Sequence, residues 1–506
     1  MIRQHAIGDL LRRTAARHPS KTAVVYGDLR QSYADLDRAV NRTANALAAR
    51  GVGKGDRFAI FSHNNHAFVV AYFALARLGA ISVPVNFMLG AEEVAYILRH
   101  SGATGMLAEE ALLPVAEAAV TPAVAVRGVI GAGRDGWEPF AAWPAFEDDS
   151  EPQAEIADDD PIQLMYTSGT ESRPKGATLS SRSLVAQYVT CVVDGEMSAD
   201  DVEVHALPLY HCAQLHCFLT PGIYLGATNI ILPGPSPAAI LATIEGERAT
   251  KLFCPPTVWI SLLRHPDFDR RDLSSLRKGY YGASIMPVEV LKEMATRLPD
   301  VRLFNFYGQT EMAPVATILG PEEQLTRLGS AGRPALNVET RIVDDAGEPV
   351  PPGVVGEIVH RSPHAMLGYW NDPDRTAEAF RGGWFHSGDL GVLDEDGYLA
   401  VVDRKKDMIK SGGENVASRE VEEALYQHPA IAEAAVFGVP DPKWIEAVTA
   451  AVVLREGAGV TEQELIEFLR ERLAPFKTPK RVIFLESLPK NASGKVLKRE
   501  LRSSIS

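Results

Sequence analysis

Cysteine is scarce in this sequence, with only four residues in a chain of 506. They stand at Cys191, Cys212, Cys217 and Cys254. So few cysteines do not make a disulfide framework in a chain this long, and they suit a reducing compartment.

Long apolar runs are also missing. The most hydrophobic segment, 68–85, is interrupted by Arg77, Gly79 and Pro84, and residues 1–16 contain no continuous apolar core. The first segment is therefore too broken to span a bilayer, and the second does not form a secretory signal. We expect a cytoplasmic protein that is not integral to a membrane.

Positive charge is in deficit, since the formal net charge is -14. This argues against nonspecific binding to nucleic acid or to anionic lipid. The exception is segment 477–502, which has eight basic residues against two acidic ones and suits a polyanionic ligand. The length itself predicts two or more domains.

Short apolar segments alternate with helical ones along most of the chain. Segments 57–61, 81–85 and 228–232 read as strands, whereas 35–50 and 67–78 read as helices. Such alternation predicts an α/β architecture with largely parallel sheets.

Two further segments bear on the domain organisation. The acidic segment 147–160 predicts a solvated connector rather than a metal site, because adjacent like charges repel. Near the C-terminus, strands are expected at 433–439, 447–454 and 481–485, and an amphipathic helix at 462–473. They predict a small α+β unit.

One loop, Tyr166 to Gly176, combines hydroxyl residues, glycines and a lysine directly after an apolar run. Backbone N–H groups, hydroxyls and one ammonium in such a loop can bind a polyphosphate. The loop does not fit the Walker A pattern, because Lys175 precedes the last glycine. Taken alone, it is also compatible with a polar surface turn.

Five further segments follow in a fixed order: 307–311 (YGQTE), 387–391 (SGDLG), 403–410 (DRKKDMIK), 411–415 (SGGEN) and 489–495 (PKNASGK). With the loop at Tyr166, they make the chain resemble the adenylate-forming superfamily of acyl-CoA synthetases, peptide-synthetase adenylation domains and luciferases. The resemblance extends over essentially the whole length.

The resemblance implies a large N-terminal domain at 1–402, a hinge at 403–406 and a mobile α+β domain at 407–506. The N-terminal domain would contain largely parallel sheets flanked by helices and a β-barrel-like subdomain. Lys406 would be the hinge residue, and Gly412 and Gly413 would line the tunnel for the pantetheine arm of CoA. The family leaves open whether the chain forms a homodimer.

The resemblance also implies a nucleotide site for ATP and Mg²⁺. Its residues would be Thr167, Ser168, Gly169, Thr170, Lys175, Gly282, Ala283, Ser284, Tyr307, Gly308, Asp389, Arg404 and Lys410. Within it, Tyr307 would stack on adenine, and Asp389 and Arg404 would hold the ribose. The catalytic set would be Lys495, Thr310, Glu311 and His211, with Glu311 as the Mg²⁺ ligand.

The implied reaction forms an acyl adenylate with release of pyrophosphate, then transfers the acyl group to CoA with release of AMP. The acyl pocket would be lined by His211, Cys212, Leu215, Met312, Ala313 and Pro314. These residues are mostly apolar and uncharged, which disfavours a dicarboxylic or amino-acid substrate. Leu215 stands where some long-chain ligases have a tryptophan gate, so we expect a medium- to long-chain fatty acid as the substrate. An aryl acid of the coumarate or benzoate type, with Gln214 or Tyr281 serving a ring hydroxyl, is the main alternative. A carrier protein as acceptor is another.

The phosphate loop also departs from most relatives of the superfamily, which have Thr-Thr-Gly where this chain has Thr170-Glu171-Ser172. We expect Glu171 to point away from the nucleotide and activity to be retained, because a carboxylate beside a triphosphate is unfavourable.

Overall fold

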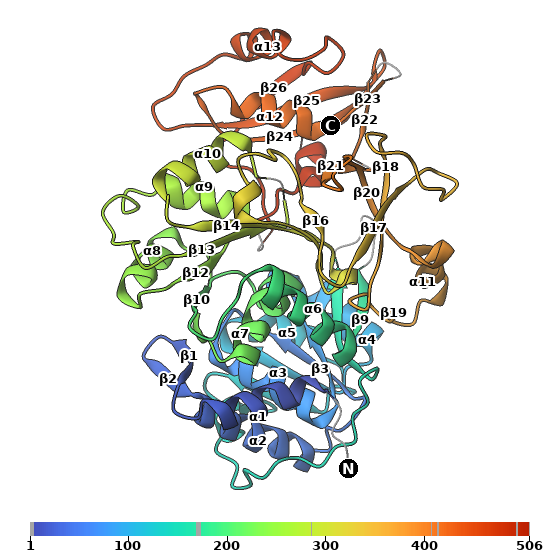
Figure 1. Cartoon of the computed structure of the whole chain (residues 1–506). Helices are drawn as coiled ribbons and strands as arrows, with labels where there is room; N and C mark the ends of the chain where they lie inside the picture. Colours follow the sequence, from blue (N-terminus) through green and yellow to red (C-terminus); the bar gives the residue numbers. More distant parts are fainter. Residues whose placement is uncertain are drawn as a thin grey trace.

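A computed structural model describes the chain at residues 5–167, 174–284, 286–405, 407–411, 414–491 and 494–504. Figure 1 shows a large N-terminal part built on two sheets and a smaller C-terminal unit that lies above helices α9 (Pro256–Arg264) and α10 (Val288–Arg297). Among the described residues, no helix combines the length and apolar character needed to cross a bilayer.

The first large sheet has eight strands in the order β19-β9-β8-β4-β3-β5-β6-β7. They are β3 (Arg57–Phe61), β4 (Ile81–Pro84), β5 (Gly105–Glu109), β6 (Val126–Ile130), β7 (Glu138–Pro139), β8 (Pro161–Thr167), β9 (Lys175–Ser180) and β19 (Gly368–Tyr369). From β8 to β7 the neighbours are parallel, whereas β8, β9 and β19 pair antiparallel. The strands predicted at 57–61 and 81–85 are confirmed as β3 and β4.

The second large sheet has nine strands in the order β16-β15-β14-β13-β12-β10-β11-β1-β2. They are β1 (Thr22–Tyr26), β2 (Leu29–Ser32), β10 (Val202–His205), β11 (Thr228–Ile231), β12 (Lys251–Phe253), β13 (Lys278–Gly282), β14 (Arg302–Gly308), β15 (Val315–Leu319) and β16 (Arg333–Pro334). Its centre, from β14 to β1, is parallel, as the α/β prediction requires.

Helices cover both large sheets, and one continuous apolar core joins them. Besides α9 and α10, they are α1 (Ile7–Arg17), α2 (Tyr33–Ala49), α3 (His66–Leu78), α4 (Ala91–Ser101), α5 (Leu113–Ala119), α6 (Ser181–Asp194), α7 (Thr220–Leu225), α8 (Pro237–Gly246) and α11 (Pro373–Ala379). Helix α3 is buried all round because it is apolar all round. Asn65 caps its first turn and Gly79, at φ 68°, ends it.

The acidic segment 147–160 forms neither a helix nor a strand, as predicted. Asn45 of α2 donates to the backbone carbonyls of Asp148 and Ser150 at 3.0 and 2.9 Å, and Lys54 Nζ lies 2.7 Å from Asp160 Oδ2. The connector is therefore held against α2 and the start of β3, and part of its charge is neutralised.

Two smaller sheets complete the fold. The subdomain predicted to resemble a barrel is a four-stranded antiparallel sheet of β17 (Glu339–Val343), β18 (Gly356–Arg361), β20 (Phe385–Leu393) and β21 (Leu399–Arg404). The C-terminal sheet contains β22 (Ile409–Ser411), β23 (Glu414–Val416), β24 (Ile431–Asp441), β25 (Ile445–Leu454) and β26 (Arg481–Phe484). Helices α12 (Ser418–Tyr426), α13 (Glu462–Arg470) and α14 (Lys498–Ser503) accompany it.

The C-terminal unit has its own apolar core, which includes Val436 on β24, Val448 on β25 and Leu465 on α13. The predicted strands and helix of this unit are confirmed, although α13 ends at Arg470. The exact division at 402 and the hinge at 403–406 stay predictions, since Lys406 lies outside the described residues.

Candidate active site

The end of the β8–β9 hairpin carries the phosphate loop. Thr167, the last residue of β8, faces Lys175, the first residue of β9, across the antiparallel pair. Ser168, Gly169 and Thr170 lie outside the described residues, as does Glu171, so their predicted positions are not tested. The hairpin nevertheless places Thr167 and Lys175 at the two ends of the loop.

Lys175 and Glu311 meet at one aromatic residue, Tyr369 of β19. Lys175 Nζ lies 5.3 Å from the centre of the Tyr369 ring, and the Tyr369 hydroxyl donates to Glu311 Oε1 at 2.9 Å. Burial, together with the charge of Glu311, raises the pKa of Tyr369 above its ordinary value, so its hydroxyl stays protonated. The sequence analysis did not single out Tyr369, and its pairing with a residue 58 positions away is visible only in the fold.

The residues predicted to hold adenine and ribose come together where β14 meets β20 and β21. Tyr307 Oη donates to Asp389 Oδ2 at 2.8 Å, and Gln309 Nε2 donates to the same oxygen at 3.0 Å. Arg404 Nε lies 3.2 Å from Asp389 Oδ1, without hydrogen-bond geometry. Asp389 is thus fixed through Oδ2, whereas Oδ1 is buried beside the Arg404 guanidinium and accepts no hydrogen bond within the described part of the chain.

Gln309 is a member of this cluster that sequence reasoning missed. Its amide also donates to Tyr307 Oη, at 2.7 Å. Its place inside the segment YGQTE could have marked Gln309 as a site residue. Its polar side chain alone, however, does not indicate that its partner is Asp389, 80 residues away on another strand.

Two glycines of the site are required by close backbone contacts. A Cβ on Gly282 would lie 2.2 Å from Phe306 O, and one on Gly308 would lie 1.7 Å from Pro314 O. Ala283 and Ser284, which follow Gly282, are exposed, and Ala283 has a φ of 64°. The turn after β13 therefore presents these two residues at the surface, where their predicted contact with adenine stays a prediction.

His211 lies in the loop between β10 and the π-helical turn η3 (Ala213–Leu219). Its Nδ1 accepts from the Ala213 N–H at 3.3 Å, which leaves the ring proton on Nε2. Burial, and then the charge of Lys495, lowers the pKa of His211 to about 4, so the ring is neutral at pH 7. The neighbouring Cys212 Sγ lies 3.2 Å from Thr310 Oγ1, which joins this loop to the motif of Glu311.

A small cavity of about 10 Å³ opens beside His211. It is lined by Leu207, Pro208, His211, Ala213, Gln214, Phe253 and Ala283. That volume accommodates about one water molecule. Of the residues predicted for the acyl pocket, only His211 is among these. Cys212, Leu215, Met312, Ala313 and Pro314 are buried nearby, and their role in the pocket stays a prediction.

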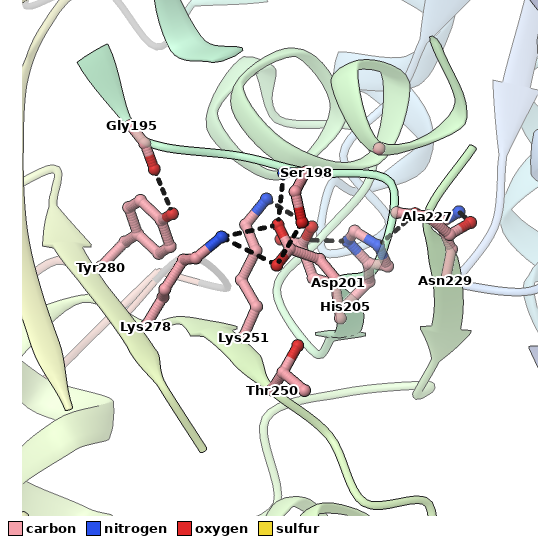
Figure 2. Close-up of polar contacts among 12 residues, drawn as sticks. Gly195, Ser198, Asp201, His205, Ala227, Asn229, Thr250, Lys251, Lys278 and Tyr280 are labelled. Carbon is pink, nitrogen blue, oxygen red and sulfur yellow. Dashed lines mark hydrogen bonds and ion pairs between the residues drawn. The ribbon is translucent and has the colours of Figure 1, made fainter. Parts of the chain in front are cut away.

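Behind the cavity, Gln214 is held by a buried polar network that sequence reasoning did not find. Gln214 Oε1 accepts from the Leu207 N–H at 3.2 Å, and its amide nitrogen lies 2.8 Å from His205 Nδ1. His205 Nε2 in turn lies 3.0 Å from Asn229 Oδ1. Figure 2 shows His205 and Asn229 beside Lys251, whose ammonium lies 2.9 Å from the carboxylate of Glu203.

The C-terminal loop that carries Lys495 contacts the N-terminal domain. Thr257 Oγ1 on α9 donates to Gly494 O at 2.8 Å, and Asn491 Oδ1 accepts from the Lys495 N–H at 2.9 Å. Gly494 has a φ of 81°, and a Cβ there would lie 2.7 Å from Thr257 Oγ1. These contacts hold the loop of Lys495 against α9, and the positive charge of Lys495 contributes to the lowered pKa of His211.

Among the described residues, the structure does not bring the other residue predicted from the C-terminal part, Lys410, to the site. Lys410 is exposed on β22, where its backbone N–H donates to Glu446 Oε2 at 2.7 Å. Gly412 and Gly413 lie outside the described residues, and so does Lys406.

Two family profiles match the chain. The profile described as "AMP-binding enzyme" covers residues 11–370, and the one described as "AMP-binding enzyme C-terminal domain" covers residues 420–495. The chain belongs to the AMP-binding enzyme family. Homologues in this family are AMP-forming acid–CoA ligases, so the chain is an adenylate-forming ligase of acyl or aryl acids that uses ATP and CoA.

Individual relatives align along nearly their whole length. A feruloyl-CoA synthase of Amycolatopsis sp is 40% identical over 505 residues, which cover 99% of each chain. A long-chain-fatty-acid–CoA ligase of Mycobacterium tuberculosis is 34% identical over 505 residues, covering 99% of this chain and 98% of the relative. The crystal structure of the anthranilate CoA ligase AuaEII with anthranoyl-AMP superposes with a TM-score of 0.92 at 28% identity, covering 99% of this chain and 97% of that one.

Proposed function

We propose that this AMP-binding enzyme activates an aromatic carboxylic acid and transfers it to CoA. The observation that carries the proposal is the lining beside His211, which includes the Phe253 ring and the fully buried amide of Gln214. The cavity itself, at about 10 Å³, holds about one water molecule, so the chemistry of this lining, and not its volume, indicates the class of acid. A planar ring with a polar substituent suits such a wall better than a long alkyl chain, because an alkyl chain leaves a buried amide with unused hydrogen-bonding capacity. The feruloyl-CoA synthase and the anthranilate ligase among the relatives support the same choice.

Gln214 retains capacity for a ligand. One lone pair of Oε1 and one N–H of the amide are not used by its contacts to Leu207 and His205. Tyr281, the other residue expected to serve a ring hydroxyl, donates instead to Gln324 Oε1 at 2.6 Å. We therefore assign recognition of a ring hydroxyl or amine to Gln214.

A panel of acids tests the substrate class. Hydroxycinnamic, hydroxybenzoic, indoleacetic and anthranilic acids should have a kcat/KM at least about 10-fold above that of saturated C8, C12 and C16 acids, with ATP, Mg²⁺ and CoA present and AMP and thioester measured. Gln214→Leu should lower kcat/KM about 10-fold for a ring-hydroxylated acid, and much less for the acid without the hydroxyl. Preference of the wild-type enzyme for the C12 or C16 acid would restore the fatty acid as the substrate.

The nucleotide contacts follow from the cluster around Asp389. The carboxylate of Asp389 and the guanidinium of Arg404 would hold the ribose hydroxyls, and Tyr307 would lie against the base. Thr167 and Lys175 would bind the outer phosphates. Glu311 fits a Mg²⁺ ligand, because Tyr369 orients one carboxylate oxygen and the other accepts no hydrogen bond from the described residues. A single carboxylate would suit Mg²⁺, and the bound ion would neutralise part of the charge of the phosphates.

His211 and Lys495 would act at the two ends of the bond that forms. The neutral His211 ring carries its proton on Nε2 and can donate to one oxygen of the substrate carboxylate, which orients the other oxygen toward the α-phosphorus. Lys495 would offset the negative charge that accumulates on the phosphate as pyrophosphate leaves. No general base is needed, because the acid is already ionised at neutral pH.

The hydrogen bond from Thr257 to Gly494 gives a test of this closed arrangement. Thr257→Val should slow acyl-adenylate formation about 3- to 10-fold, because one hydrogen bond holds the loop of Lys495 against α9. Thioester formation from supplied acyl adenylate should not change. Ser261→Ala is the matched control, since its hydroxyl donates to Thr257 O one turn further along α9 and does not touch the loop. Equal slowing by both variants would attribute the effect to α9 rather than to the loop.

A further inference from the structure

A second and larger cavity, of about 150 Å³, lies behind the β8–β9 hairpin. It is enclosed by the last turns of α4, the first residues of β9, the segment after β19 and the start of α11. The side chains of its wall that bear on a ligand are those of His100, Lys175, Tyr369, Trp370, Asp372 and Arg375. The volume is enough for on the order of ten water molecules and so for a small polyanion.

The polar groups of this wall are mainly hydrogen-bond donors. Lys175 and Arg375 contribute two fixed positive charges. His100 Nδ1 lies 2.8 Å from the Tyr166 hydroxyl, so the neutral ring can keep its proton on Nε2. Trp370 Nε1 is buried and has no hydrogen-bond partner within the described part of the chain, which is costly unless a ligand accepts from it.

Among the described residues of the wall, Asp372 is the one carboxylate, and it is engaged by α11. Its Oδ1 accepts from the Arg375 N–H at 3.1 Å, and its Oδ2 lies 3.4 Å from the Arg375 guanidinium. Asp372 therefore orients Arg375. The described part of the wall thus has two cationic side chains and one carboxylate, which favours an anion over a cation.

Tyr369 separates this cavity from the proposed metal ligand. The same ring that lies 5.3 Å from Lys175 Nζ donates through its hydroxyl to Glu311. A phosphate group bound near Glu311 would thus be separated from the cavity by the Tyr369 side chain. Lys175 lines the cavity and contacts the same ring.

We propose that this cavity binds inorganic pyrophosphate as it leaves the active site. When the carboxylate oxygen forms its bond to the α-phosphorus, the bond from that phosphorus to the bridging oxygen breaks, and pyrophosphate leaves with the electron pair. Lys175 would pass the dianionic end toward Arg375, His100 and Trp370. The proposal rests on AMP-forming chemistry and is independent of which acid the enzyme activates.

Calorimetric titration of the full-length enzyme with magnesium pyrophosphate, and separately with ATP, tests this assignment without any acid present. Arg375→Gln should weaken pyrophosphate binding about 10-fold and change ATP binding less than about 2-fold. Trp370→Phe removes one donor and should weaken pyrophosphate binding about 3-fold. Arg270→Gln is the control for loss of a positive charge, because Arg270 is exposed between α9 and β13, with 76% of its side chain accessible.

Three results would overturn the assignment. If Arg375→Gln and Trp370→Phe both bound pyrophosphate as tightly as the control Arg270→Gln, the cavity would not bind the product. Equal weakening of ATP and pyrophosphate would make it a part of the ATP site. Orthophosphate binding as tightly as pyrophosphate would reduce it to an unselective anion site.

Discussion

Lys495→Ala should lose acyl-adenylate formation by about 10²- to 10³-fold, the effect of removing a charge placed where negative charge develops in the transition state. The loop contacts α9 through Gly494, and the charge of Lys495 contributes to the lowered pKa of His211, which supports the proposed role of Lys495 beside the acid and the α-phosphate. Thioester formation from supplied acyl adenylate should be nearly unchanged, because no pyrophosphate leaves in that step and no negative charge builds up on it. Pyrophosphate release and thioester formation, measured separately, check the two steps.

Lys490→Ala provides the control for this prediction. Lys490 belongs to the same loop but forms an ion pair with Glu433 at 2.6 Å on the C-terminal unit itself. It should retain adenylation within about 3-fold, because the Lys490 ammonium is paired within the C-terminal unit. Equal loss of both half-reactions in Lys495→Ala would contradict the role proposed for Lys495.

Lys251→Met should destabilise the protein by about 3–5 kcal/mol at pH 8, because it leaves a buried carboxylate without its partner. The ammonium of Lys251 (labelled in Figure 2) and the Glu203 carboxylate are both fully buried and lie 2.9 Å apart in the second large sheet. Met is similar in length and can pack against Phe218 and Tyr280, whose ring centres lie 5.3 and 5.4 Å from the ammonium. Chemical denaturation monitored by far-UV circular dichroism measures the change.

The pH dependence of Lys251→Met separates charge from packing. Burial already raises the pKa of Glu203 to about 7, and Lys251 opposes this, so removal of Lys251 raises the pKa further. A folded-state pKa above the unfolded value means that stability is greatest at low pH and is lost as the pH rises. The variant should therefore be less destabilised at pH 5 than at pH 8, and Glu203→Gln in the same chain should remove most of that difference. A loss that does not vary with pH would indicate a packing defect instead.

The sequence predicted best the parts of the fold whose signal is local. The strand at 57–61 and the helix at 67–78 were found because continuous apolar residues and their flanking turns are local features. The buried pair of Glu203 and Lys251 was not found, because charged residues in short strands ordinarily indicate exposure. Only the pairing of β10 with β12 reveals that each charge is matched.

The candidate site could be predicted only in part for the same reason. Motif order identified Tyr307, Asp389 and Arg404, which the fold brings into one cluster. Tyr369 and Thr257 could not be predicted, since each acts through a residue distant in the chain, Glu311 for one and Gly494 for the other. The lining of the cavity beside His211 was the least predictable part, because Phe253 contributes to it from β12, far in sequence from the segment of His211.

The enzyme is expected to activate its acid as an adenylate before CoA reacts. The most direct measurement supplies ATP, Mg²⁺, CoA and the best acid of the panel, and determines the nucleotide product together with the thioester. We expect one AMP and one pyrophosphate for each thioester formed. Formation of ADP and orthophosphate instead would mean that the acid is activated as an acyl phosphate, and would contradict the account.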